Sequence, residues 1–393
     1  LSDDPTTFTD GTATDVATPR KYSSLVSWSS PKLTFQECFV RLRIEQLNAD
    51  GEVVATSYSR IYSATTVDNA TYTWQAVDGV WDGDLDDRAH WSCSVSDPDD
   101  RYDYPLHASS SAVFPANCKA TITVPRSMQL LGIIKLGGDG ADVDLVPASG
   151  IQDIVLDLGR VDNQARTAES KITFENLKLD FQGNETDPGE YNTVVFRNCD
   201  ASFVTTVNAR RNHVRMILEN TTFQINGALR VGGSDSCFLI SNSWCNVNSV
   251  IELGATVVGG TIRFEGENPV LVAKGKDMRA GMNNNATTLE FLVPAGGYRE
   301  LPIQVPSSPS EYCLRSNGKT GVSFAIRVLP ESPILKEFVT CVIPLIDWWK
   351  KGIDSTVPVT YDAGGVAGAN FVFSKTSAAA GEEYGWTTQA DAG

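Results

Sequence analysis

Hydrophobic and polar positions repeat along the middle of the chain with a period of 22 residues. In each repeat a short, mostly apolar run ends in an asparagine. The aligned runs are residues 172–176, 194–198, 216–220 and 238–242. Two more apolar rows keep the same step, namely Phe181, Phe203, Ile225 and Val247, and then Val207, Leu229 and Ile251. Three short apolar segments per repeat predict three strands per coil of a parallel β-helix, whose inward faces stack into one core.

The asparagine at the end of each run is expected to close a tight turn between the first two strands of its coil. Asparagine adopts the left-handed backbone conformation of such turns more readily than most residues with a side chain. Amides in neighbouring coils are also close enough to hydrogen-bond to each other. The predicted structural ladder consists of Asn176, Asn198, Asn220 and Asn242.

Charged residues occupy outward positions of the repeat. One predicted outward column holds Glu175, Arg197, Glu219, Ser241 and Arg263. A second holds Asn208, Arg230, Glu252 and Lys274. Because adjacent coils lie about 4.8 Å apart, opposite charges in one column predict salt bridges from coil to coil.

The regions on either side of the repeat are less regular. We assign regular coils to 166–275, the first irregular coils to 74–165, and irregular coils with a C-terminal cap to 276–393. A cap is needed because an open last coil exposes unpaired strand edges. In residues 1–73, two alternating runs joined by a turn at 48–51 predict a hairpin within a small β-sandwich or an added sheet.

These patterns predict an all-β chain. The expected fold is a right-handed parallel β-helix with about 22 residues per coil, preceded by a small antiparallel β region and closed by irregular capping strands.

The segment before the first coils contains Trp81 and Trp91, then Tyr104 and Pro105, and then the apolar run 112–114. Here the chain resembles large secreted bacterial β-helix proteins of the autotransporter-passenger and pectin-lyase-like kind. In those proteins a Gly-x-Trp … Trp segment and a following proline open the helix before its first Val-Thr-Val strand. The resemblance covers residues 74–270. It implies secretion and a β-helix, and it assigns no functional residue.

The net charge of the chain bears on which kinds of molecule it can bind. The 48 acidic residues outnumber the 32 basic ones, for a net charge of −16, which argues against nucleic-acid binding. No run of eighteen apolar residues occurs, so no membrane span is predicted. Such an acidic composition is common outside cells, and we expect an extracellular or cell-surface location. The first residue is Leu1, from which we expect a processed or trimmed start.

The chain has eight cysteines and no Cys-x-x-Cys pair, which excludes zinc-ribbon and thioredoxin-like sites. An even number permits disulfides in an oxidising compartment, and free buried thiols are the alternative. We predict the disulfides Cys93–Cys118 and Cys313–Cys341, because each closes an irregular loop near one end of the helix and would contribute roughly 3 kcal/mol. The remaining cysteines of the coils are expected to be free and buried, namely Cys199, Cys237 and Cys245.

An acidic loop offers the one predicted metal site. Asp82, Asp84 and Asp86 stand at alternate positions, a spacing at which carboxylates can wrap Ca²⁺. A solvated acidic loop is the alternative, since no closing glutamate follows at the EF-hand offset. No cofactor other than calcium is expected.

Two groups of residues are candidates for catalysis. Tyr191, His213 and Asp235 fall one period apart and are expected to stack, which suits an acid–base line. The alternative is a polar loop edge. Arg230 and Glu252 lie in the outward column where pectin-degrading proteins of this fold place their chemistry. That column lacks the paired carboxylates of hydrolysis, which favours a structural ladder.

Residues suited to sugar binding also occur. Trp244 could stack on a sugar ring, and Arg210, Arg211 and Arg215 could hold an acidic sugar.

We therefore expect a secreted or cell-surface structural or adhesion module without catalysis, whose partner is a polysaccharide or a host or matrix surface. The alternatives are a polysaccharide lyase or glycoside hydrolase, and a glycan-binding protein without turnover.

Overall fold

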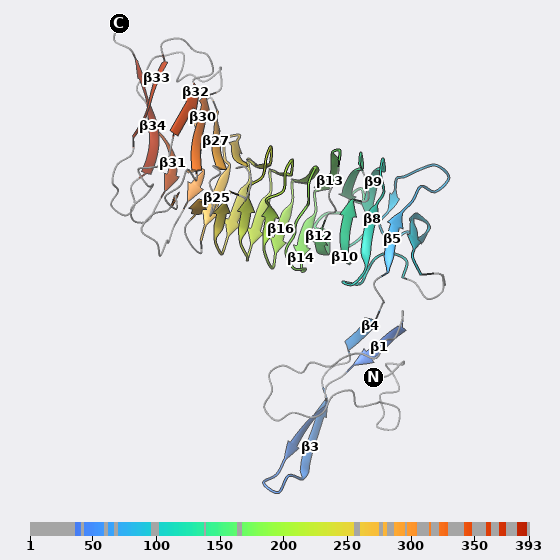
Figure 1. The fold of residues 1–393 in the computed structure, drawn as a ribbon. Helices are drawn as coiled ribbons and strands as arrows, with labels where there is room; N and C mark the ends of the chain where they lie inside the picture. The colour runs from blue at the N-terminus through green and yellow to red at the C-terminus, as the bar shows by residue number, and fades with distance from the viewer. Residues whose placement is uncertain are drawn as a thin grey trace.

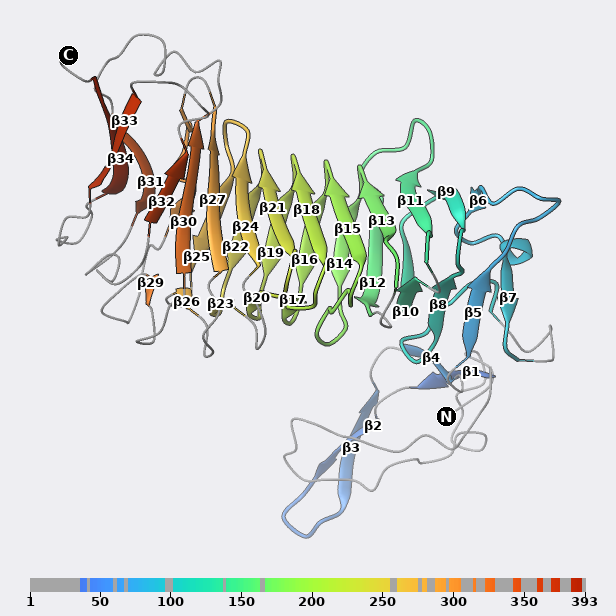
Figure 2. The ribbon, with the colours of Figure 1, turned by 45° about the horizontal axis from the view of Figure 1, so that its top comes forward.

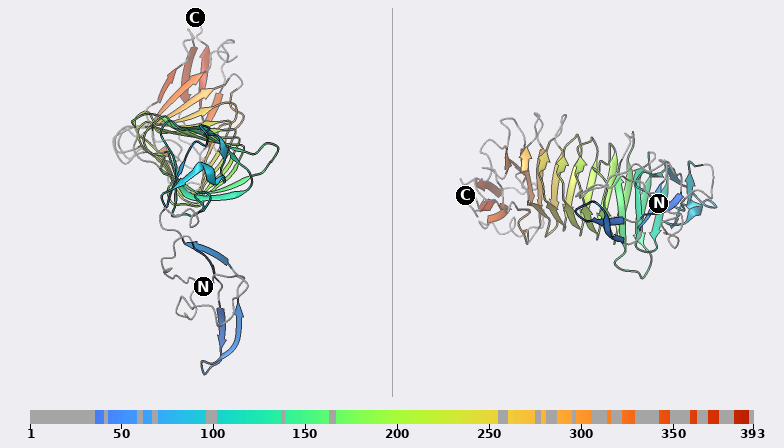
Figure 3. Two further views of the ribbon diagram at one scale, coloured as in Figure 1. Left: turned by 90° about the vertical axis from the view of Figure 1, so that its right-hand side faces the viewer. Right: turned by 90° about the horizontal axis from the view of Figure 1, so that it is seen from below.

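The computed structural model of the chain consists almost entirely of β-strands. It describes residues 36–40, 43–58, 62–66, 70–95, 102–136, 139–162, 167–254, 260–274, 278–280, 287–294, 297–304, 314–315, 322–328, 342–347, 359–362, 369–374 and 383–390. In this part of the chain, parallel strands stack into a β-solenoid of about seven turns (Figures 1 and 2). The left view of Figure 3 looks along the stack of coils. The predicted parallel β-helix is confirmed.

Three sheets run along the solenoid. The 14-strand sheet has the order β33 (Ala369–Ser374), β34 (Glu383–Ala390), β31 (Val342–Asp347), β28 (Ile303–Gln304), β25 (Val270–Ala273), β22 (Trp244–Val247), β19 (Thr222–Ile225), β16 (Asp200–Phe203), β14 (Lys178–Phe181), β12 (Val155–Val161), β10 (Met128–Leu136), β8 (Ser111–Phe114), β5 (Thr71–Trp74), β7 (Trp91–Cys93). The 11-strand sheet has the order β32 (Val359–Asp362), β30 (Val322–Val328), β27 (Thr287–Val293), β24 (Thr261–Glu265), β21 (Cys237–Ser241), β18 (Arg215–Glu219), β15 (Asn192–Arg197), β13 (Ser170–Glu175), β11 (Asp142–Pro147), β9 (Lys119–Val124), β6 (Gly83–Asp84). The 5-strand sheet contains β17 (Val207–Ala209), β20 (Leu229–Val231), β23 (Ile251–Leu253), β26 (Met278–Ala280) and β29 (Leu314–Arg315).

The core is built from inward side chains that stack from one coil to the next. Alternation along each strand places every second residue inside, which gives the 14-strand sheet its inward phenylalanines. The rings of Phe181 and Phe203, 22 residues apart, stack with centroids 4.2 Å apart at 6°. Phe174 and Phe196 of the 11-strand sheet stack at 5.5 Å and 15°. These contacts hold the 22-residue register.

The register changes after Asn242, because the following coils are longer. Ser241 pairs with Glu265, 24 residues later, and Arg263 pairs with Leu239 instead. Likewise Glu252 pairs with Arg279, so that Lys274 lies outside this column. The predicted column positions of Arg263 and Lys274 are therefore wrong. Extra residues in the loops of these coils shift the register, and a fixed 22-residue step could not anticipate them.

The first coil is closed by aromatic side chains. Trp74 of β5 and Trp91 of β7 meet edge to face at 4.9 Å, and both contact Phe114. Trp74 donates its indole hydrogen bond to the carbonyl of Trp81 at 2.8 Å. Buried indoles need such partners, and Trp74 and Trp91 lie where the core begins. The strand β5 places this beginning at residue 71.

Before the solenoid, β2 (Arg43–Leu47) and β3 (Val53–Tyr58) form the predicted antiparallel hairpin. A second antiparallel pair joins β1 (Gln36–Val40) to β4 (Tyr62–Thr66). At the other end, β34 pairs antiparallel with both β31 and β33, next to the last parallel strands.

The disulfide prediction for Cys93 and Cys118 is wrong, because both are free. Cys93 ends β7 opposite Tyr72 in the 14-strand sheet, whereas Cys118 precedes β9 of the 11-strand sheet. Cys199, Cys237 and Cys245 are also free, with Cys199 and Cys245 buried and Cys237 half-buried. The predicted pair Cys313–Cys341 lies outside the described residues.

Candidate functional site

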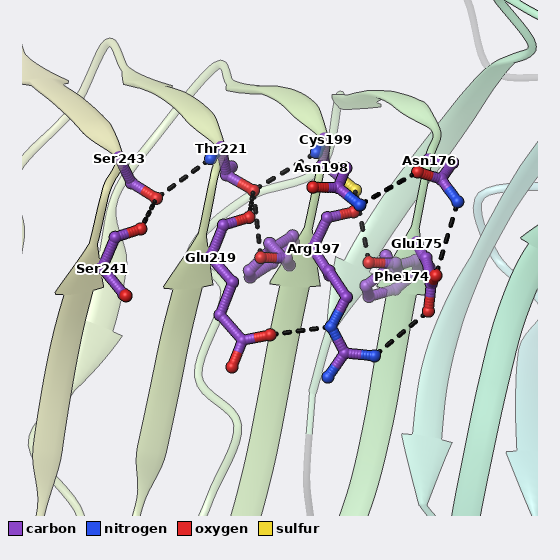
Figure 4. Close-up of polar contacts among 11 residues, drawn as sticks. Phe174, Glu175, Asn176, Arg197, Asn198, Cys199, Glu219, Thr221, Ser241 and Ser243 are labelled. Carbon is purple, nitrogen blue, oxygen red and sulfur yellow. Dashed lines mark hydrogen bonds and ion pairs between the residues drawn. The ribbon is translucent and has the colours of Figure 1, made fainter. Parts of the chain in front are cut away.

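The asparagine ladder lies at the turn between the 11-strand and 14-strand sheets. All four asparagines adopt left-handed backbones, with φ between 45° and 56° for Asn176, Asn198, Asn220 and Asn242. Asn198 donates a side-chain hydrogen bond to Asn176 Oδ1 at 3.1 Å (Figure 4). In the longer coil that follows, Asn242 Oδ1 instead accepts from the backbone N–H of Glu267 at 2.8 Å. The turn conformation thus recurs at every rung, while the amide partners change.

A second, buried ladder follows directly after the asparagines, and sequence analysis missed it. Cys199, Thr221 and Ser243 take equivalent positions one period apart, and Figure 4 shows them in a row. Ser243 Oγ accepts from Thr221 N at 2.9 Å, and Thr221 Oγ1 accepts from Cys199 N at 3.2 Å. Thr221 Oγ1 donates back to the carbonyl of Phe196 at 3.0 Å. Small residues with a thiol or hydroxyl group, one position after the last three asparagines of the ladder, were the available signal.

Charged side chains on the 11-strand sheet pair from coil to coil. Arg197 bridges Glu175 at 3.1 Å and Glu219 at 2.7 Å, one coil to either side (Figure 4). Further along, Arg263 pairs with Glu290 at 2.6 Å. The side chains of these pairs are between 12% and 43% exposed, so each pair contributes modestly, but together they resist sliding between coils.

The catalytic candidates Arg230 and Glu252 are held in a network of ion pairs on the 5-strand sheet. Arg230 contacts Glu252 at 3.1 Å and Glu185 at 2.9 Å. Glu252 also accepts from Arg210 at 2.5 Å, across two coils. A carboxylate shared by two guanidinium groups is held in place by both of them, which suits a structural role better than proton transfer.

Tyr191, His213 and Asp235 stack in adjacent coils at the corner before the 11-strand sheet. Their φ angles are 59°, 57° and 54°, a left-handed column without glycine or asparagine. The rings of Tyr191 and His213 lie parallel at 4.3 Å, and His213 Nδ1 is 3.6 Å from Asp235 Oδ2. The His213 and Asp235 side chains are 36% and 78% exposed, so a ligand can reach both. This cluster has the parts of an acid–base pair.

The three candidate arginines do not form one cluster. Arg210 pairs with Glu252, and Arg211 pairs with Asp187 at 3.2 Å. Arg215 begins β18, in register with Thr193 and Cys237 on the 11-strand sheet. The structure therefore offers no common site for an acidic sugar on these residues.

The acidic loop proposed for calcium uses its carboxylates on the neighbouring coil. Asp82 Oδ1 accepts from the backbone N–H of Thr121 at 2.6 Å, and Asp86 pairs with Arg126 at 3.0 Å. Asp84 is exposed in β6. Within the described residues, no three histidine, cysteine or acidic side chains converge as a metal site would require. The geometry gives the calcium hypothesis no support.

The structure brings one pair of carboxylates together that the sequence reading missed. Asp157 of β12 and Asp180 of β14 oppose each other in adjacent strands, at outward positions. Asp180 accepts from Ser202 Oγ at 2.7 Å, and Asp157 from Gln129 at 3.4 Å. The sequence signal for this pairing is that Leu156 and Leu158 align with Leu179 and Phe181. These residues are 23 positions apart, so a 22-residue period does not align them.

No protein-family model matches the chain, and no curated protein or solved structure matches it either. Among the described residues, no helix has the length and apolar character needed to cross a membrane.

Proposed function

We propose that this chain is a structural or adhesion module that acts outside the cell without catalysis, either secreted or at the cell surface. The observation that supports this proposal is the network of ion pairs between side chains of different coils. Arg197 and Arg230 each bridge two carboxylates from other coils, and Glu252 is shared between two arginines. Groups locked to each other in this way stiffen a solenoid along its axis. The acidic composition and the resemblance of the opening segment support the extracellular location.

The proposal is tested by looking for turnover. The full chain is incubated with a panel of polysaccharides, and reducing ends and unsaturated products are measured. We expect no product above that of a heat-denatured control. Clear turnover that disappears in Glu252→Ala or His213→Ala, with unchanged thermal melts, would replace this proposal with the second candidate.

That second candidate is a carbohydrate-active β-helix, a polysaccharide lyase or a glycoside hydrolase. Two observations favour it over other enzyme classes. His213 stands between the Tyr191 ring and the Asp235 carboxylate at an accessible corner, which is an arrangement for moving a proton. Asp157 and Asp180 also lie side by side on an outer face, and hydrolysis of glycosidic bonds uses two carboxylates.

A further inference from the structure

One outer face of the solenoid differs from the others in its chemistry. Over β16, β19 and β22 of the 14-strand sheet, the outward side chains that follow Asp200 carry no charge. This group, called the neutral patch, consists of Ser202, Val204, Thr222, Gln224, Asn226, Trp244, Asn246 and Asn248. The outer faces of the other two sheets carry the ion-pair networks described above. In a chain of net charge −16, an uncharged face of this extent is a distinct surface.

The neutral patch is rich in groups that both donate and accept hydrogen bonds. In the part of the chain that the structure describes, the side chains of Gln224 and Thr222 have no hydrogen-bond partner. Asn248 donates to Asn226 Oδ1 at 2.9 Å, which leaves further donors and acceptors on both amides. These exposed amides and hydroxyls repeat from coil to coil at the ladder spacing.

Two apolar groups complete the neutral patch. Trp244 is half-buried, and its indole N–H donates to Asn246 Oδ1 at 3.1 Å, which fixes the orientation of the ring. Val204 is 46% exposed. An oriented aromatic surface beside amide groups suits a ligand with an apolar face and a polar rim, as a sugar ring has.

The neutral patch has different boundaries at its two ends. Towards the C-terminus, the positions that follow Trp244 and Asn246 in register are Val270 and Val272, which are 0% and 4% exposed. Because these outward side chains are covered, the patch ends there. The exposed Lys274, which directly follows β25, lies next to this border. Towards the N-terminus, the acidic residues Asp180 and Asp200 follow. A polyanion would meet these carboxylates and find no lysine or arginine within the patch.

From this geometry we infer that the neutral patch binds an uncharged oligosaccharide or polysaccharide. One sugar ring lies against Trp244, and hydroxyls of the saccharide bond to Gln224 and Asn226. The inference rests on the proposed adhesion function and names its ligand class and its surface.

The test measures retention of the full chain in affinity gels that contain soluble polysaccharides. Neutral probes are galactomannan, dextran, hydroxyethyl cellulose and glucan from barley. Acidic probes are polygalacturonate and hyaluronate. The variants are Trp244→Ala and Gln224→Ala, with Thr193→Ala on the outer face of the 11-strand sheet as the matched control. Thermal melts of every variant verify folding.

The expected result is retention by at least one neutral polysaccharide and by neither acidic one. Trp244→Ala should weaken binding about tenfold, as expected for a lost ring contact, and Gln224→Ala several-fold, while Thr193→Ala leaves binding unchanged. Retention should not change between low and high salt, since no charges are involved. If either Trp244→Ala or Gln224→Ala fails to fold, the binding of the other variant tests the inference.

No retention by any neutral probe would overturn the inference, and so would retention that survives both substitutions or falls with salt. These outcomes leave the structural module without catalysis intact. Conversely, release of reducing ends from a bound neutral probe would contradict the absence of catalysis, while its loss in Trp244→Ala would still support the neutral patch.

Discussion

Asn198 donates its side-chain amide to Asn176 Oδ1 at 3.1 Å, one full coil earlier, while both residues hold left-handed backbones. A single residue type therefore meets a conformational need within its own coil and bonds to the preceding coil. Removing the Asn198 side chain should cost about 1–3 kcal/mol of unfolding free energy, through the lost hydrogen bond and the strained backbone. Asn198→Gly should recover part of this loss, since glycine keeps the backbone conformation.

The same comparison applies to Asn220, whose φ is 50°. Asn220→Ala should lower stability clearly more than Thr222→Ala, because Thr222 is exposed in a regular strand. Urea melts of these variants, and of Asn220→Gly, provide the measurement. Equal losses in Asn220→Ala, Asn220→Gly and Thr222→Ala would contradict a conformational role for the asparagines.

Gly266 takes the place of the next asparagine in the ladder, opposite Asn242, with a φ of 83°. A Cβ atom there would approach Asn242 Oδ1 to 2.3 Å, and this oxygen already accepts from Glu267 N. Gly266→Ala should therefore strain the left-handed backbone and also displace the Asn242 side chain, which together should lower the unfolding free energy by roughly 2–4 kcal/mol.

The matched control is Gly150→Ala. Gly150 has a similar φ of 79° and nothing within 4 Å of an added Cβ, so this variant reports backbone strain alone, about 1–2 kcal/mol. Thermal melts of both variants separate the two effects. A loss in Gly266→Ala no greater than in Gly150→Ala would mean that the Asn242 contact contributes nothing.

Burial raises the pKa of the Cys199 thiol to about 11. In the unfolded chain the thiol ionises near pH 8.5, so the folded state keeps a proton that the unfolded state loses. This contribution to stability is fully present below the unfolded pKa and declines as pH rises towards the folded pKa. The decline should be at most about 1.4 kcal/mol per pH unit between roughly pH 8.5 and 11.

The check is a series of urea melts across this pH range for the wild type and for Cys199→Ser. Serine does not titrate here, and Ser243 shows that a hydroxyl fits the equivalent position two coils later. The variant should lose stability less steeply with pH than the wild type. Parallel slopes would show that the Cys199 thiol is not responsible.

Thiol labelling tests the absence of the Cys93–Cys118 disulfide. Burial raises the pKa of Cys118 to about 12, so its thiol should resist alkylation in the folded chain at neutral pH. Unfolding without reductant should make both Cys93 and Cys118 alkylatable, as peptide mass mapping would show. Peptides that label only after reduction would restore the disulfide.

The structure could be predicted from the sequence where neighbouring coils have equal length. Between 172 and 247, a constant 22-residue step aligned the apolar rows, so parallel strands, core phenylalanines and turn asparagines were all predictable. Periodicity suffices there because each coil contacts only its neighbours, and their side chains must stack in register.

Where coils differ in length, only the tertiary structure decided which residues are neighbours. Loop residues moved Arg263 and Lys274 out of their predicted columns, and a 23-residue step hid the pairing of Asp157 with Asp180. The sequence likewise could not predict which side chains pair with each other. Periodicity places a residue on a face, but whether Arg210 reaches Glu252 or joins Arg211 depends on packing and on competing charges within a few ångströms. The sequence thus determined the repeating backbone, and the packed structure determined the surface chemistry.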